Sequence, residues 1–575
     1  MAFRATHIMA KKLSYLSATS DTPLLGDTIG DMFDKIVTQY PDNEALVVVH
    51  QNVRWSYHEL QERVDTLARA FIAVGLKKGE RIGIWSPNCS EWLLMQVATA
   101  KIGAILVNIN PSYRLHELEY ALNQSGCSMI VIADQFKTSN YTQMMYDLAP
   151  ELHRHELGSL IAPKVPNLRA VIRLHTEQTP GMWSWDELLS HAPSVNAQDL
   201  AQRQAELSFD EPINIQYTSG TTGYPKGATL SHHNIVNNGY FVARTMKFTD
   251  KDRLVIPVPL YHCFGMVMGN LGCLTHGATM IYPSEGFEPE AVLQAAQNEK
   301  ATAIYGVPTM FIAELDHPNF HQYDLSGLRT GIMAGSPCPV EVMKKVQTVM
   351  HMRDMQIAYG MTETSPVSTQ TRIGTPLDKQ VSTVGQIHPH LEVKVIDPET
   401  EQVLPIGKKG ELCTRGYSVM LCYWENEDAT RKAIDAARWM HTGDLAVIDE
   451  DGYVNIVGRI KDMIIRGGEN IYPREIEEFL HTHPKIANVQ VIGIPDETRG
   501  EEVMAWVQLR EGEATTVADI QAFCQGQIAA YKIPKYFKFT DYFPMTVTGK
   551  VRKVEMREIS IGELGLEKAA GMKTA

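Results

Sequence analysis

Short apolar runs alternate with helical segments along the first part of the chain. The predicted strands here lie at 45–49, 81–85, 104–107 and 129–132. The predicted helices lie between them, at 57–74, 91–101 and 115–123. The alternation resumes after residue 210, with predicted strands at 213–218, 278–282, 303–305 and 330–333. Strands separated by helices are typical of mostly parallel sheets covered by helices.

Two later regions have a different pattern. Region 385–458 has short predicted strands at 391–396, 410–414 and 453–457, with Gly, Asp and Pro turns between them, which indicates a smaller antiparallel or barrel-like subdomain. Beyond residue 461 the pattern predicts helices at 474–481 and 517–528 and strands at 489–494 and 503–509. That stretch is long enough for a small α+β domain.

These patterns predict an α/β fold in two main parts. Residues 21–458 form a large N-terminal domain of helix-covered parallel sheets plus the barrel-like subdomain, and residues 459–575 form a mobile α+β C-terminal domain. A hinge at 458–462 joins them. Residues 1–20 are expected to be a loose N-terminal extension, and we see no internal repeat.

Composition excludes several classes of protein. The chain has 575 residues, which is too long for one compact core. It is 44% hydrophobic and 21% charged, as ordinary soluble proteins are. The net charge of −14 argues against nucleic acid as a partner. Its eight cysteines include no CxxC pair and no zinc spacing, so we expect free thiols in a reducing compartment.

No stretch predicts an integral membrane segment. The longest apolar run, 92–107, is interrupted by Gln96, Lys101 and Gly103, which favours a buried helix followed by a strand. We expect a cytoplasmic protein. The alternative is the mitochondrial matrix, because residues 1–20 hold Arg4, Lys11 and Lys12 and no acid, as a transit peptide can.

A glycine-rich stretch at 217–227, YTSGTTGYPKG, carries the first chemical signal. Glycines let several backbone N–H groups point at one anion, hydroxyls add donors and can touch a phosphate-bound metal, and Lys226 adds a charge. The stretch follows a predicted strand, where ligand loops of α/β sheets lie. No GxxxxGK[ST] sequence occurs, so this is not a Walker loop. The loop alone indicates only polyphosphate binding.

The stretch resembles the signature loop of the adenylate-forming superfamily, which includes acyl- and aryl-CoA synthetases, firefly luciferase and peptide-synthetase adenylation domains. The resemblance covers about residues 27–555. Within it, the stretches 107–113 and 117–122 look most like medium-chain fatty acyl-CoA synthetases of the acyl-CoA synthetase family member 2 type. The resemblance assigns nucleotide binding to Thr218, Ser219, Gly220, Thr221, Thr222, Gly223, Tyr224, Pro225 and Lys226.

Other motifs follow in the family's order. Tyr359-Gly360-Met-Thr362-Glu363-Thr resembles the motif in which the aromatic stacks on adenine, Thr362 contacts the α-phosphate and Glu363 serves Mg²⁺, with Thr222 as a second metal residue. A carboxylate beside polyphosphate is repulsive unless a hard cation lies between them. The segment Gly335-Ser336-Pro337 resembles the lining of the adenine site.

The remaining motifs concern ribose, the hinge and catalysis. The segment Trp439-Met-His-Thr-Gly-Asp444 resembles the motif whose aspartate binds both ribose hydroxyls, and Arg459 is expected to touch the ribose. Lys461 matches the pivot, and Gly467 and Gly468 match the wall of the pantetheine tunnel. Lys550 matches the lysine that stabilises charge in the adenylation transition state.

On the acyl side, the segment Pro259-Leu-Tyr-His262-Cys-Phe-Gly265 resembles the stretch beside the substrate carboxylate. His262 can donate to it or be an ordinary core histidine. No acid stands here, whereas amino-acid-activating relatives place an Asp in this region. Glycines at 265, 269 and 272 have helical spacing, which favours equally an alkyl-chain channel and close helix packing.

The sequence therefore predicts an acid–thiol ligase. A carboxylic acid, most simply a medium-chain fatty acid, reacts with Mg²⁺-bound ATP to give acyl-adenylate, and CoA then takes the acyl group. The alternatives are another acid- or aryl-CoA ligase, an enzyme loading a carrier protein, and a non-catalytic nucleotide-binding protein. A hydrolase is disfavoured, since GxSxG and HExxH are absent. Chain length, pathway and whether the chain forms a homodimer are left open.

Overall fold

The computed structural model describes residues 12–218, 225–336, 338–466, 469–496, 498–546 and 549–570. Its first large sheet has eight strands in the order β10-β9-β6-β4-β5-β11-β12-β22. Their bounds are Trp183–Ser184 (β10), Ala170–Arg173 (β9), Cys127–Ile132 (β6), Arg81–Trp85 (β4), Ile105–Asn108 (β5), Pro212–Thr218 (β11), Lys226–Ser231 (β12) and Cys422–Tyr423 (β22). The strands from β10 to β11 are parallel, and β12 and β22 are antiparallel additions.

The second large sheet has nine strands, in the order β19-β18-β17-β16-β15-β13-β14-β2-β3. Their bounds are Gln386–Ile387 (β19), Val367–Gln370 (β18), Asp354–Gly360 (β17), Thr330–Ala334 (β16), Ala303–Gly306 (β15), Arg253–Val255 (β13), Thr279–Tyr282 (β14), Glu44–Val48 (β2) and Val53–Ser56 (β3). The stretch from β17 to β2 is parallel, as the alternation of strands and helices predicts.

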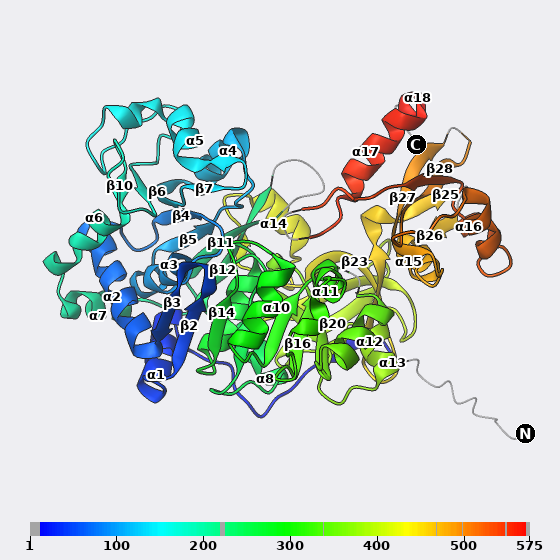
Figure 1. Ribbon diagram of the computed structural model, residues 1–575, viewed down its shortest axis with the longest axis horizontal. Helices are drawn as coiled ribbons and strands as arrows, with labels where there is room; N and C mark the ends of the chain where they lie inside the picture. The colour runs from blue at the N-terminus through cyan, green and yellow to red at the C-terminus, as the bar shows by residue number, and fades with distance from the viewer. Residues whose placement is uncertain are drawn as a thin grey trace, which may run out of the picture.

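Helices separate and cover these sheets (Figure 1). The layer between the sheets contains Tyr57–Ala73 (α2), Ser90–Ile102 (α3), His232–Thr245 (α8) and the π-helix Phe264–Leu271 (η4). The outer face of the first sheet carries Leu115–Ser125 (α4) and Tyr141–Leu148 (α5), and that of the second carries Pro289–Asn298 (α10), Pro308–Leu315 (α11) and Val340–Val349 (α12). The stacking buries both faces of each sheet, which explains the continuous apolar strands.

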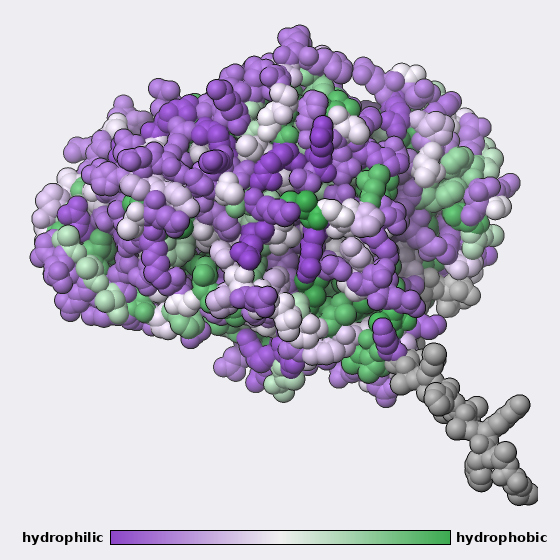
Figure 2. Space-filling model, turned by 90° about the horizontal axis from the view of Figure 1, so that it is seen from below, coloured by the Kyte–Doolittle hydropathy of each residue, from purple (hydrophilic) through white to green (hydrophobic). Residues whose placement is uncertain are grey.

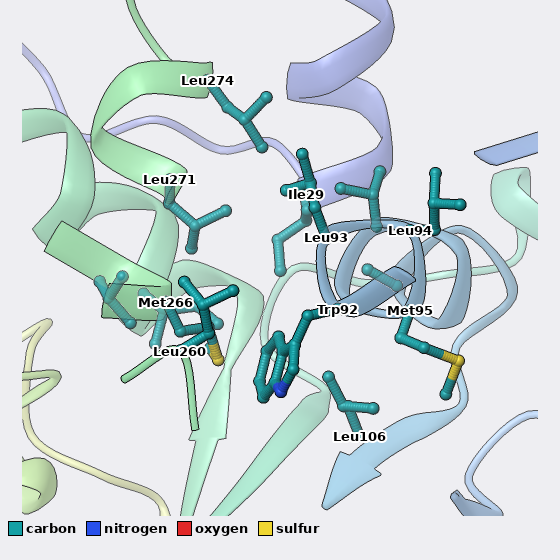
Figure 3. Close-up of a cluster of buried hydrophobic side chains, with 14 of the residues drawn as sticks. Ile29, Trp92, Leu93, Leu94, Met95, Leu106, Leu260, Met266, Leu271 and Leu274 are labelled. Carbon is teal, nitrogen blue, oxygen red and sulfur yellow. The ribbon is translucent and has the colours of Figure 1, made fainter. Parts of the chain in front are cut away.

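Helix α3 shows why the run 92–107 is so apolar. Trp92, Leu93 and Met95 are fully buried, and Figure 3 shows them beside Leu260, Met266 and Leu271 on one side and Leu106 of β5 on the other. A helix between two sheets has no solvent face, so its sequence needs no polar stripe. The predicted helix–strand pair is confirmed, and among the described residues no helix is long and apolar enough to cross a membrane.

The third sheet is antiparallel, in the order β1-β20-β21-β23-β24. Its strands are Tyr15–Ser17 (β1), Leu391–Ile396 (β20), Gly410–Gly416 (β21), Met440–Ile448 (β23) and Val454–Arg459 (β24). The antiparallel subdomain predicted at 385–458 is present. Residues 15–17 do not belong to a loose extension, because β1 pairs with β20.

The C-terminal region has a sheet and a core of its own. Its strands are Ile464–Arg466 (β25), Glu469–Ile471 (β26), Ile486–Asp496 (β27), Gly500–Leu509 (β28) and Tyr536–Phe539 (β29). They pack with helices Pro473–Leu480 (α15), Val517–Cys524 (α16) and Lys553–Leu564 (α17). Helix α16 ends before the predicted residue 528, because Gln525 is extended and Gly526 has a φ of +72°. In Figure 1 this region lies beside β23 of the third sheet.

The surface agrees with the burial pattern. Figure 2 shows mostly hydrophilic residues on the face seen from below, with hydrophobic residues in small, separated groups. This mixed surface is ordinary for globular proteins.

Candidate active site

The predicted adenine-binding residues lie where parallel strands of the nine-stranded sheet end. Gly335 and Ser336 follow β16, and Tyr359 and Gly360 close β17. Ligands of open α/β sheets bind beyond these carboxyl ends. A Cβ atom at position 360 would lie 1.7 Å from the Pro366 carbonyl oxygen, so this strand end requires glycine.

Asp444 joins three predicted ligand residues in one cluster. It is buried in β23, opposite Arg459 of β24. Its Oδ1 accepts from Arg459 Nε at 3.0 Å, and its Oδ2 accepts from the Tyr359 hydroxyl at 2.7 Å. Burial and the nearby carboxylate raise the pKa of Tyr359, and Asp444 raises the pKa of Arg459. Both carboxylate oxygens therefore face donors at the sheet junction.

Glu363 has a partner that the sequence did not reveal. It lies with Thr362 in the 3₁₀ turn Thr362–Thr364, is buried, and accepts the Tyr423 hydroxyl at 2.7 Å through Oε1. Lys226 Nζ lies 5.1 Å from the centre of the Tyr423 ring. Tyr423 thus stands between the predicted metal carboxylate and the predicted phosphate lysine. These two contacts mark Tyr423 as part of the site, and no sequence motif pointed to it.

The described ends of the phosphate loop form the base of a hairpin. Thr218 ends β11 and pairs with Lys226, which begins β12, and the Tyr120 hydroxyl donates to the Pro225 carbonyl at 3.1 Å. The two strands therefore bring the two ends of the predicted phosphate loop together. The other predicted residues of this loop, the adenine site and the tunnel wall lie outside the described residues: Ser219, Gly220, Thr221, Thr222, Gly223, Tyr224, Pro337, Gly467 and Gly468.

Lys550 reaches this site from the C-terminal region. It lies at the base of a small hairpin, where its N–H donates to Thr546 Oγ1 at 3.1 Å and its carbonyl accepts from Thr546 N–H at 2.7 Å. A Cβ at Gly335 would lie 3.7 Å from Lys550 Cε, and one at Gly549 would lie 2.9 Å from Val307. The hairpin is therefore packed against the ends of the parallel strands.

The electrostatic surroundings of Lys550 are mixed. Burial is the main cause that lowers its pKa, and Arg459 lowers it further. Glu363 and Asp444 act in the opposite direction. One ammonium group thus lies within electrostatic reach of the two predicted ligand carboxylates, which are far apart in sequence.

His262 is neutral and has a defined tautomer. Burial, assisted by Lys550, lowers its pKa to about 3. Its Nδ1 accepts the Phe264 N–H at 3.2 Å. A neutral imidazole that accepts at Nδ1 carries its proton on Nε2, so Nε2 is available as a donor. The neighbouring Cys263 is held by Gln216, whose Oε1 accepts the thiol at 3.0 Å.

The glycines after His262 serve close packing. A Cβ at Gly265 would lie 2.6 Å from the Pro259 carbonyl oxygen, and one at Gly269 would lie 3.0 Å from Ile256. A Cβ at Gly239 of α8 would lie 2.9 Å from Leu271. Moreover, the segment is a π-helix, so the expected α-helical spacing does not place these glycines on one face. Of the two interpretations of these glycines, close packing is the one supported.

Lys461 lies between the two regions, exposed in the 3₁₀ turn Ile460–Asp462. Two contacts cross this boundary nearby. Lys409 Nζ lies 3.4 Å from the centre of the Tyr472 ring, and Arg474 donates through Nη1 to the Ile456 carbonyl. Among the described residues, these two contacts join the C-terminal region to the third sheet near the turn.

Comparison with known proteins shows the same two-part organisation. A family model of AMP-binding enzymes matches residues 33–424, and a model of the AMP-binding enzyme C-terminal domain matches residues 475–550. YngI of Bacillus subtilis (strain 168), which carries the name acyl-CoA synthetase, is 48% identical over 94% of this chain and 98% of its own. The mitochondrial medium-chain acyl-CoA ligase ACSF2 of Danio rerio is 47% identical over 96% of this chain and 91% of its own.

A solved structure adds information on the arrangement of the parts. ATP-bound MatB from Rhodopseudomonas palustris superposes with a TM-score of 0.79 at 28% identity, over 94% of this chain and all of that one. The same protein without ligand gives a TM-score of 0.70. The present structure thus superposes better on the ATP-bound form of that protein than on its ligand-free form.

Proposed function

The chain belongs to the AMP-binding enzyme family, and on that premise we propose that it is an ATP-dependent acyl-CoA ligase. It converts a carboxylic acid and ATP to acyl-adenylate and pyrophosphate, and then the adenylate and CoA to acyl-CoA and AMP. The observation that carries this proposal is Lys550, which lies within electrostatic reach of Glu363 and Asp444 although it belongs to the C-terminal region.

In the first half-reaction, a substrate carboxylate oxygen attacks the α-phosphorus of ATP and the bond to the pyrophosphate oxygen breaks. Negative charge grows on the α-phosphate and on the leaving group. The Lys550 ammonium group, aimed at this charge, stabilises the transition state more than the ground state. Binding of the polyanion also opposes the burial that lowers the pKa of Lys550, so the amine is protonated when it acts.

The nucleotide would be held by residues of the sheets together with the phosphate loop. The carboxylate of Asp444 accepts hydrogen bonds from both ribose hydroxyls. To do so, it exchanges its hydrogen bond with the Tyr359 hydroxyl or with Arg459 for one with the ribose. The Tyr359 ring packs on adenine beside Gly335, Ser336, Pro337 and Gly360. The loop residues from Thr218 to Lys226 and the Thr362 hydroxyl contact the phosphates.

Glu363 has the chemistry of a magnesium ligand. It is a buried carboxylate with one oxygen held by Tyr423, and hard oxygen donors suit Mg²⁺. Glu363 and Thr222 would hold the ion, which when bound neutralises phosphate charge.

The second half-reaction requires Lys550 to leave. We propose domain boundaries at 21–458 and 459–575, with rotation about the hinge at 458–462 and Lys461 as its pivot. The rotation would bring Gly467 and Gly468 to the site as walls of a tunnel for CoA. The CoA sulfur attacks the acyl carbonyl carbon, the bond to the AMP oxygen breaks, and the thiol proton is lost to solvent.

On the acyl side, the Nε2–H group of His262 donates to the substrate carboxylate. No acid stands in this segment to hold an ammonium group, and its neighbours Phe264, Met266 and Val267 are buried and apolar. We therefore propose an apolar acyl group, and medium-chain fatty acids by similarity to the ACSF2 protein. Each buried methylene contributes about 0.8 kcal/mol.

The test is a screen of pyrophosphate release across straight-chain acids from acetate to palmitate and several aryl acids, with and without CoA. We expect medium-chain acids to give the highest rates and acyl-CoA to form with AMP. Release of pyrophosphate with no thioester to CoA, but with transfer to a carrier protein, would support the carrier-loading alternative. Nucleotide binding without turnover would support the non-catalytic one, against which the presence of both Lys550 and Glu363 already counts.

The place of the protein in the cell stays a prediction. We keep the cytoplasmic prediction and the matrix alternative, because the similar proteins include a bacterial protein and a mitochondrial one. Formation of a homodimer remains open as well.

A further inference from the structure

A second cluster of chemical groups lies in the third sheet, outside the residues used above. Glu411 and Cys413 are two positions apart on β21, so both side chains project from one face. Cys413 pairs with His441 on the neighbouring strand β23. One carboxylate oxygen, the thiol sulfur and one ring nitrogen of the three residues lie within 4.8 Å of one another. We propose that Glu411, Cys413 and His441 bind a borderline-soft divalent cation of the Zn²⁺ type.

The spacing of these three atoms fits tetrahedral coordination. Tetrahedral zinc with ordinary bond lengths separates a nitrogen from an oxygen ligand by about 3.3 Å and from a sulfur ligand by about 3.5 Å. Here His441 Nδ1 lies 3.1 Å from Glu411 Oε2 and 3.7 Å from Cys413 Sγ. The two separations from the ring nitrogen are thus close to those of tetrahedral zinc, and all three atoms lie within 4.8 Å of one another.

Neighbouring groups orient the side chains of Glu411 and His441, as neighbouring groups commonly orient metal ligands. Glu411 Oε1 accepts the Gly443 N–H at 3.1 Å, which leaves Oε2 as the ligand oxygen. His441 Nε2 lies 3.9 Å from Asp435 Oδ2, so a second carboxylate faces the ring nitrogen that the metal would leave free. Carboxylates that orient a histidine and N–H groups that orient a carboxylate are usual around metal ligands.

The surroundings also permit entry of an ion. The side chains of His441 and Asp435 are 23% and 35% exposed, whereas Cys413 is buried. Lys394 pairs with Cys413 across the strands β20 and β21, and its ammonium group lies 4.5 Å from the centre of the Trp439 ring, in a cation–π contact. Binding forms a metal–sulfur bond and releases the thiol proton, together with the extra proton of any imidazolium, with no change of oxidation state.

The test uses the full chain after treatment with a chelator, free of nucleotide, and titrated with Co²⁺ and with Zn²⁺. We expect one equivalent of Co²⁺ to produce a thiolate-to-cobalt charge-transfer band, and one equivalent of Zn²⁺ to abolish it. The proposed magnesium site offers oxygen ligands alone and cannot give this band. Absence of the band in the wild-type chain, or a stoichiometry that never reaches one, would overturn the proposal.

Variants identify the ligands. Cys413→Ser should eliminate the charge-transfer band, and Glu411→Gln should weaken cobalt binding at least about tenfold, since each removes one ligand. Cys422→Ser is the matched control, because Cys422 is a partly exposed free cysteine on another sheet, and it should bind cobalt as the wild type does. Thermal unfolding of each metal-free variant reports whether it is folded. Retention of the band in folded Cys413→Ser, or its loss in Cys422→Ser, would show that the site is not this one.

Discussion

Asp444 and Lys550 serve one proposed site but are held in different ways. Asp444 lies inside β23, between two paired strands, and both of its carboxylate oxygens are hydrogen-bonded. Lys550 lies at the base of a small hairpin that is tied to itself through Thr546. This hairpin packs against Gly335 and Val307, and the contacts that cross the boundary also include the pairing of Lys409 with Tyr472 and the Arg474 hydrogen bond.

The difference matches the two half-reactions. AMP stays bound through both steps in the proposed reaction, so its ligands can be part of a sheet. In the proposed reaction Lys550 acts in the first step alone, and it is carried by a region that has a sheet and a core of its own. Motion of such a region costs less free energy than rearrangement inside a sheet. The predictions below separate the fixed part, which is the set of proposed nucleotide ligands in the sheets, from the movable part, which is the C-terminal region that carries Lys550.

The largest effect is expected for Lys550→Ala. Adenylate formation should fall by about 10²–10³-fold, because one charge that stabilises the transition state is removed. Thioester formation from supplied acyl-adenylate should be largely spared. Pyrophosphate release and acyl-CoA formation are measured separately, with Lys538→Ala as control, since Lys538 pairs with Glu563 elsewhere in the same region. Equal loss in both steps would contradict the role of Lys550.

Lys461→Pro should have the opposite effect. Proline restricts φ and removes an N–H group, so a stiffened turn should slow thioester formation by roughly tenfold or more and leave adenylation nearly unchanged. Lys461→Ala keeps a flexible backbone and should retain most of the second step. A Lys461→Pro enzyme with normal transfer to CoA would show that the hinge lies elsewhere.

Tyr423→Phe probes the fixed part. Loss of the hydrogen bond to Glu363 should lower kcat/KM for ATP by about tenfold, since hydrogen bonds to charged groups contribute about 1.5–3 kcal/mol. If the variant affects only the binding of nucleotide and metal, the ratio of the adenylation rate to the rate of thioester formation should be the same as in the wild type. Tyr453→Phe, at the residue before β24, serves as control. An unchanged dependence on ATP and Mg²⁺ would mean that Tyr423 does not position Glu363.

Lys409→Met should have a small effect on the movable part. An exposed cation–π contact contributes about 0.5–1 kcal/mol, so adenylation should fall about two- to fivefold while transfer to CoA is unchanged or faster. Lys408→Met is the matched control, because the neighbouring lysine carries the same charge without the Tyr472 ring. If the two variants behave alike, net charge and not the ring contact is responsible.

The smallest effect on adenylation is expected from lowering the pH. The pKa of His262 is about 3, so the imidazole is neutral at any usual assay pH and should contribute no acid limb above about pH 5. On the alkaline side, the active form of Lys550 is protonated and burial lowers its pKa in the enzyme without nucleotide, so kcat/KM for ATP should decline as pH rises, earlier than for an exposed lysine. The profiles of wild type and His262→Asn are compared. An acid limb that only the variant lacks would show that His262 titrates.

Much of the fold could be predicted because its signals are local. Strand β4 and helix α2 were predicted to within one residue, since each has an apolar period and a clear end. The N-terminal strand β1 could not be predicted, because three residues have no period and gain their place only from β20. Helix α16 was predicted too long, because a turn at Gln525 interrupts an otherwise helical pattern.

The sequence alone determined the layers of sheet and helix and the order of the motifs around Tyr359, Glu363, Asp444 and Lys550, since both depend on short stretches of chain. Tertiary structure decided the rest. It brought Tyr423 to Glu363, filled the space beside Gly265 and Gly269, and set Cys413 opposite His441. These outcomes depend on the register and packing of segments far apart in the chain, which no local pattern encodes.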